Sequence, residues 1–141
     1  MRTKVLLGTL LAAALSLTAA SAQAQVVVII SSKNPISKLT SDQVSQIFLG
    51  QAKTFYTGAM VEPLDLEEGA ARHEFYQKVT GKNPAQLKAY WSKLTFSGTA
   101  QPPQAMPNSQ AVVKKVGENP KFIGYVEKSA VDSGVKVVLT L

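Results

Sequence analysis

The sequence predicts an α/β fold in which a mainly parallel sheet is flanked by helices. Segments with strand patterns alternate with segments of helical periodicity, which is typical of such sheets. The first of them, VVVII at residues 26–30, is a continuous β-branched run, the pattern of a strand buried on both faces. Hydrophobic residues make up 45% and charged residues 17% of the 141-residue chain, as in folded globular proteins.

The first helix is predicted by a capping box. Thr40 and Gln43 stand three residues apart, so each side chain can bond the other's backbone N–H. The apolar residues Val44, Ile47 and Phe48 follow at helical spacing, and Gly50 ends the helix. Residues 61–66 predict a second strand, in which Pro63 indicates an edge position or a late start.

Two further helices follow. One is expected to begin at about Glu67 and to end at Gly81, with a stripe of Ala71, Phe75 and Val79. The other begins with Asn83 as N-cap and Pro84 as first helical residue. Its apolar face consists of Leu87, Tyr90, Trp91 and Leu94. This face, together with Phe96, is expected to pack in the core against the sheet.

Residues 97–108 contain three prolines and are expected to be irregular. Ser109 is expected to cap a short helix that ends at Gly117 and turns Val112, Val113 and Val116 inward. Residues 122–127 and 135–141 predict the last strands, with a polar turn or short helix between them. No internal repeat is visible, so residues 25–141 are expected to form a single domain.

Residues 1–24 have the pattern of a cleaved signal peptide. Arg2 and Lys4 precede an apolar stretch at residues 5–20, and Ala22-Gln23-Ala24 supplies the small residues of a cleavage site. A transmembrane anchor is the alternative, but it needs about 20 strongly apolar residues. We therefore expect export to the periplasm, with Gln25 as the new N-terminus and no membrane-spanning segment afterwards.

The composition excludes several function classes. The chain has no cysteine, which excludes disulfides, a lipid-modified cysteine anchor, zinc–thiolate sites and thiol nucleophiles. The net charge of +6 is spread along the sequence and favours anionic partners only weakly. Nothing resembles a nucleic-acid-binding module, so no nucleic-acid partner is expected.

Two segments resemble a known family. Residues 39–50 (LTSDQVSQIFLG) resemble the "L-s-x-x-q-l-x-x-I-F-l-G" segment of periplasmic phosphate-binding proteins that feed ABC transporters. Residues 119–127 (NPKFIGYVE) look like the "x-P-G-A-I-G-Y-V-E" segment of the same family. Between them, Phe75-Tyr76, Tyr90-Trp91 and the proline-rich loop fall in similar order. The resemblance runs over about residues 34–127.

The resemblance implies a particular fold: a single three-layer lobe of the type II periplasmic-binding-protein fold. Phosphate binders of the family have two such lobes that close on the anion. In this lobe, their ligand motif is "R-x-D-G-S-G-T", in which Arg, hydroxyls and backbone N–H groups bind the phosphate. Here Asp65 falls at the Arg position, and Gly69 and Ala71 fall at the Ser and Thr positions. Glu67 and Glu68 add negative charge beside them, which opposes a bound dianion.

Four residues remain as candidate anion ligands. Gly69 and Ala70 can present backbone N–H groups at a helix start, and Arg72 is the only arginine after the predicted cleavage site. Ser109, at the start of a later helix, is the fourth. Glu67 and Glu68 are explained by the helix dipole, or alternatively by a site adapted to a cation or an amine.

Other chemistry has little support in the sequence. His73 is the only histidine and, between Arg72 and Glu74, is interpreted as a surface residue. No metal-ligand spacing or hydrolase nucleophile motif is present, so no cofactor, metal or catalytic residue is expected. Gly124, beside Tyr125, allows a close approach either by a helix or by a ligand.

Two hypotheses follow. The first is an exported, non-enzymatic ligand-binding protein, similar to the substrate-binding component of a phosphate ABC transporter. The second is a periplasmic interaction or signalling module that docks a membrane sensor or transporter without binding phosphate. The retained order of the motifs around the expected cleft favours the first hypothesis, whereas the short length relative to two-lobed binders and the acidic pair Glu67-Glu68 favour the second.

Overall fold

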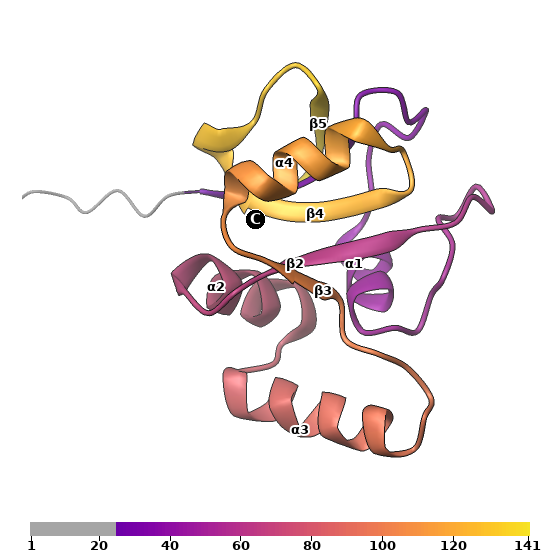
Figure 1. Ribbon diagram of the computed structural model, residues 1–141, viewed down its shortest axis with the longest axis vertical. Helices are drawn as coiled ribbons and strands as arrows, with labels where there is room; N and C mark the ends of the chain where they lie inside the picture. Colours follow the sequence, from indigo (N-terminus) through magenta and orange to yellow (C-terminus); the bar gives the residue numbers. More distant parts are fainter. Residues whose placement is uncertain (1–24) are drawn as a thin grey trace, which may run out of the picture.

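A computed structural model describes residues 25–141, which form a five-stranded sheet with helices around it (Figure 1). The predicted signal peptide, residues 1–24, lies outside the described residues. The strand order across the sheet is β3-β2-β4-β1-β5. The strands span β1 Val26–Ser31, β2 Glu62–Leu66, β3 Gln104–Met106, β4 Phe122–Glu127 and β5 Val135–Thr140.

Four of the five strands point the same way, which confirms the mainly parallel sheet. β2 pairs in parallel with both β3 and β4, whereas β1 pairs antiparallel with both β4 and β5. β1 is therefore the single reversed strand, and all six of its residues are buried. Its β-branched run predicted burial on both faces but carried no signal for strand direction.

Helices cover both faces of the sheet, and β4 shows how they are divided. Successive strand residues point to opposite faces. A Cβ added to Gly124 would meet Val112 and Val116 of α4 (Ser109–Glu118), whereas Tyr125 packs against Phe75 of α2 (Ala70–Thr80). Helix α1 (Ser41–Phe48) lies beside α2, on the side of the sheet opposite α4 (Figure 1). The three-layer prediction is confirmed.

The predicted caps of two helices are confirmed. Thr40 and Gln43 form a reciprocal capping box before α1, and Asn83 and Gln86 form a second before α3 (Pro84–Phe96). Helix α2 ends at Gly81, whose φ of 71° is in the left-handed region that glycine adopts at little cost.

Helix α2 begins three residues later than predicted. It was expected from about Glu67, but its first residue is Ala70, with Gly69 as N-cap. The backbone N–H of Glu67 donates to the Met106 carbonyl at 3.0 Å, which keeps the chain along the edge of β3 for one more residue. That pairing comes from a distant segment, so helical periodicity alone placed the start too early.

Three predictions between residues 97 and 118 are wrong in detail. The segment expected to be irregular contains β3, a three-residue edge strand that exists because β2 offers a free parallel edge. Asn108, not Ser109, caps α4, with its side-chain oxygen accepting from the Ala111 N–H at 2.9 Å. The helix also continues through Gly117 to Glu118.

Pro63 lies within β2 at no cost in hydrogen bonding. The N–H of Glu62 donates to the carbonyl of Lys121, the residue just before β4. Because successive residues of a strand point in opposite directions, the nitrogen of Pro63 faces the other side of the strand. On that side β3 pairs only from Leu64 onward. The strand is therefore not at an edge along its whole length, but it is unpaired on one side where the proline stands.

Helix α3 stands apart from the sheet, at the bottom of Figure 1. Leu87 and Trp91 are buried, and the Tyr90 hydroxyl donates to the Leu49 carbonyl at 2.6 Å. Phe96, predicted to pack in the core, is instead 97% exposed, because it is the last residue of a helix that lies apart from the sheet (Figure 1). After β4, a short 3-10 helix (Lys128–Ala130) fills the predicted turn.

Within residues 25–141, no helix combines the length and the apolar character that crossing a membrane would require.

Candidate functional site

A hollow of about 270 Å³ lies where β2 ends and where α2 and α4 begin. We refer to it as the α2/α4 hollow. All four predicted ligand residues line it: Gly69, Ala70 and Arg72 at the start of α2, and Ser109 at the start of α4. The structure thus brings together residues that are up to 40 positions apart in the sequence, though their role as ligands stays a prediction.

The start of α2 offers free hydrogen-bond donors. Gly69 is the N-cap and makes no side-chain capping bond, and the first helical hydrogen bond runs from the His73 N–H to the Gly69 carbonyl. Among the described residues, the N–H groups of Ala70, Ala71 and Arg72 have no partner. Free amides at a helix start, with the positive end of the helix dipole, favour an anion.

The start of α4 is only partly satisfied. Asn108 caps it, and the Ser109 hydroxyl oxygen accepts from the Glu127 N–H at 3.3 Å. Ser109 therefore links α4 to the end of β4 and also lines the hollow. Among the described residues, three N–H groups are therefore free at the start of α2, and two, those of Ser109 and Gln110, are free at the start of α4.

Carboxylates surround the same hollow. Glu67, Glu68 and Glu127 all line it. Glu68 bridges two neighbours: one oxygen lies 3.2 Å from an Arg72 guanidinium nitrogen, and the other lies 3.1 Å from Nε2 of His73. An incoming anion must therefore compete with Glu68 for Arg72. The predicted opposition of acidic residues to a dianion would act through this ion pair between Glu68 and Arg72.

Arg72 is held from beneath by a buried carboxylate. Asp65 is 5% exposed, and one of its oxygens lies 3.5 Å from Nε of Arg72. The same carboxylate accepts the hydroxyl of Tyr76 at 2.8 Å, the hydroxyl of Tyr125 in a very short hydrogen bond, and the N–H of Leu66 at 2.8 Å. Asp65 thus orients Arg72 and does not itself face the hollow.

The buried charge of Asp65 affects the ionisation of both tyrosines. Burial, followed by the negative charge of Asp65, raises the pKa of the Tyr76 phenol far above its usual value, and the same two causes raise the pKa of Tyr125. Both phenols therefore stay protonated and act as donors. Their rings pack tightly, with Tyr125 stacked on Phe75 at 3.9 Å between centroids and 5° between planes.

Sequence reasoning missed this network. It identified Asp65 as a departure from the family motif but did not pair it with Tyr76 and Tyr125. A usable signal was present, because a tyrosine on an otherwise apolar face needs a partner for its hydroxyl, and a carboxylate at a buried strand end supplies one.

The remaining candidates have structural explanations. His73 is half-exposed and contacts Glu68, as a surface residue would. Gly124 allows the approach of α4, not of a ligand, since an added Cβ would collide with Val112. In residues 25–141, no three His, Cys, Asp or Glu side chains cluster closely enough to hold a metal ion.

Comparisons with solved structures agree with the family resemblance at the level of the fold. The chain is similar to a candidate phosphate ABC transporter substrate-binding protein from Clostridium perfringens with bound phosphate, with a TM-score of 0.63 and 24% identity. It is also similar to an ABC-type phosphate transport receptor from Vibrio cholerae, with a TM-score of 0.56 and 15% identity. A third similar structure is that of a possible phosphate-binding protein from Planctomyces limnophilus, with a TM-score of 0.60 and 12% identity.

These matches cover 81% of this chain but only 44%, 45% and 40% of the three solved chains. The chain thus spans less than half the length of the proteins it resembles and has the fold of one part of them. No protein-family model matches the sequence, and no curated protein does either.

Proposed function

We propose that this chain is an exported, non-enzymatic ligand-binding module that binds a small anion at the α2/α4 hollow. Phosphate is the leading candidate for that anion. The observation that carries the proposal is the set of free N–H groups at the start of α2, which open onto the same hollow as Arg72 and Ser109. Proteins of similar fold include one with bound phosphate. Export to the periplasm is inferred from the signal pattern of residues 1–24.

The proposed pose follows from the geometry. Anion oxygens accept from the N–H groups of Ala70 and Ala71, while the free side of the Arg72 guanidinium supplies charge. Asp65 keeps Arg72 in place by an ion pair on the side of its Nε, which leaves the terminal nitrogens for Glu68 or for a ligand. The acidic residues of the hollow lower the affinity for a dianion relative to a site without them.

Thermal unfolding of residues 25–141 with and without millimolar phosphate or sulfate tests the proposal. Ligand at 100 times its dissociation constant stabilises the fold by about 2.7 kcal/mol, which raises the midpoint by at least several degrees. Ala70→Pro removes one donor at a helix position that tolerates proline, so it should weaken the shift. Ser41→Pro makes the same change at the start of α1 and should leave the phosphate shift intact.

A second candidate function follows from Glu67, Glu68 and Glu127. If no anion stabilises the protein, these carboxylates have converted the hollow into an acidic surface that suits a basic partner. The chain would then be an interaction or signalling module that docks a membrane sensor or transporter. Absence of any shift with phosphate and sulfate would overturn the first proposal and favour this one.

A further inference from the structure

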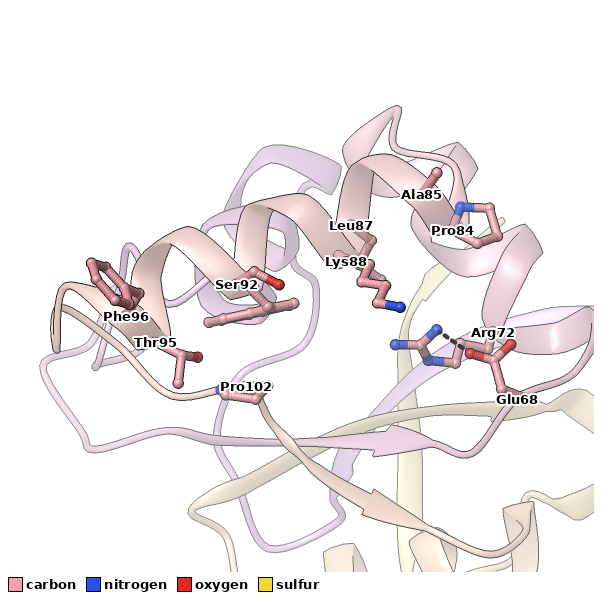
Figure 2. Close-up of a pocket in the computed structure, with 11 residues that line it drawn as sticks. Glu68, Arg72, Pro84, Ala85, Leu87, Lys88, Ser92, Thr95, Phe96 and Pro102 are labelled. Carbon is pink, nitrogen blue, oxygen red and sulfur yellow. Dashed lines mark hydrogen bonds and ion pairs between the residues drawn. The ribbon is translucent and has the colours of Figure 1, made fainter.

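A second and larger hollow, of about 810 Å³, lies beneath α3 (Figure 2). We refer to it as the α3 hollow. Its volume is in the range of small-molecule sites, and most of its wall is apolar. The apolar lining includes Pro84, Leu87, Trp91, Phe96 and Pro102. A surface of this kind favours a ligand with an apolar body.

The charged residues of the α3 hollow gather at one end. Figure 2 shows Lys88 pointing from α3 toward the ion pair of Arg72 and Glu68. Lys88 makes no hydrogen bond or ion pair with any described residue. Two cationic groups thus face one end of an apolar hollow, while the single carboxylate there, Glu68, already bonds Arg72 and His73.

Lys88 is exposed, so solvent screens part of its repulsion with Arg72, and an anion between the two cations would replace the remaining repulsion with attraction. The carboxylates nearby do not serve that purpose for Lys88, since Asp65 is buried behind Arg72 and Glu68 is shared by its two partners. An acid group bound here would gain two charge-assisted hydrogen bonds, and its apolar substituent would cover the exposed Pro102 and the small exposed part of Trp91.

We propose that the α3 hollow binds a small organic acid that has an aromatic or branched aliphatic body. Its carboxylate lies between Lys88 and Arg72, and its body packs against Pro102 and the exposed edge of Trp91. This site does not depend on phosphate binding at the α2/α4 hollow. Arg72 and Glu68 border both hollows, but Lys88 and Trp91 line only the α3 hollow of the two.

The single tryptophan of the chain reports on this site directly, because Trp91 is part of its wall. Trp91 fluorescence should change saturably on titration with 3-phenylpropionate or with hexanoate. The neutral amide of the first probe should bind about tenfold more weakly, since it lacks the charge that Lys88 and Arg72 pair. Acetate and inorganic phosphate, which have no apolar body, should leave the fluorescence unchanged.

Lys88→Gln should weaken binding of 3-phenylpropionate about tenfold, whereas Lys93→Gln, on the same helix but outside the hollow, should not. Lys88→Gln should keep any phosphate-dependent thermal shift, and Ala70→Pro should keep the fluorescence response, so the two sites can fail independently. A fluorescence signal that saturates with neither acid would overturn the inference. So would equal binding of the acid and its amide, or equal binding by Lys88→Gln and the unchanged protein.

Discussion

The hydroxyl of Tyr125 donates a very short hydrogen bond to the carboxylate of Asp65, from a position 60 residues away in the sequence. This contact joins β4 to the end of β2, at the edge of the α2/α4 hollow. It also completes the environment of a buried charge, because Tyr76 and Arg72 reach the same carboxylate from α2. A hydrogen-bonded network around a buried charge thus lies beneath the candidate site.

Removal of the buried carboxylate should strongly destabilise the protein. Asp65→Ala leaves two buried hydroxyls without their acceptor and Arg72 with Glu68 alone, which should lower the free energy of unfolding by about 3–5 kcal/mol. Tyr76→Phe removes one bond to a charged group and should cost about 1.5–3 kcal/mol. Urea denaturation measures both. Tyr56→Phe is the matched control, because that side chain is 64% exposed, and it should stay within about 0.5 kcal/mol.

Stability should fall at alkaline pH because of the same tyrosines. Burial and Asp65 raise the pKa of Tyr76 and of Tyr125 above the unfolded value of about 10. Above that pH the unfolded chain loses protons that the folded chain keeps, so the free energy of unfolding falls by up to about 2.7 kcal/mol per pH unit. Below it, the contribution of both groups is fully present.

Absorbance at 295 nm follows this ionisation. Two of the four tyrosines should ionise only together with unfolding. The double variant Tyr76→Phe with Tyr125→Phe should lose this part of the alkaline dependence. Ionisation of all four tyrosines without loss of secondary structure would contradict the prediction.

Gly124 should not tolerate a side chain. A Cβ at this position collides with Val112 of α4, and the crowded packing should lower the free energy of unfolding by about 1–3 kcal/mol in Gly124→Ala. Val112→Ala opens space at the same point, so the double variant should lose less stability than the two single variants together. If the two single effects simply add in the double variant, contact with Val112 is not what prevents a side chain at position 124.

Neutralising Glu68 should strengthen anion binding. Glu68→Gln removes the negative charge that competes for Arg72, so phosphate affinity should rise about threefold to tenfold. Calorimetric titration at low ionic strength is the appropriate measurement, because salt screens the effect. Glu74→Gln in α2 is the control, because Glu74 pairs with Lys78 outside the hollow. Unchanged or weaker binding by Glu68→Gln would show that Glu68 does not compete with the ligand.

The sequence by itself determined the local features of this protein. The capping boxes at Thr40 and Asn83, the left-handed end of α2 at Gly81 and the buried run of β1 all depend on residues within a few positions of one another. Local hydrogen bonds and local periodicity specify such features, so reading neighbouring residues is enough. The motifs of the family resemblance predicted the fold for the same reason, since each is a short continuous segment.

Only the tertiary structure decided the direction of β1, the existence of β3, the late start of α2 and the partners of Asp65. Each depends on a contact between segments that are far apart in the chain. The energy of such a contact cannot be inferred from a local sequence pattern. The exposure of Phe96 belongs to the same group, since helical spacing assigns a residue to a face but not to a neighbour. The candidate site is built at those contacts, where distant helix starts and strand ends meet.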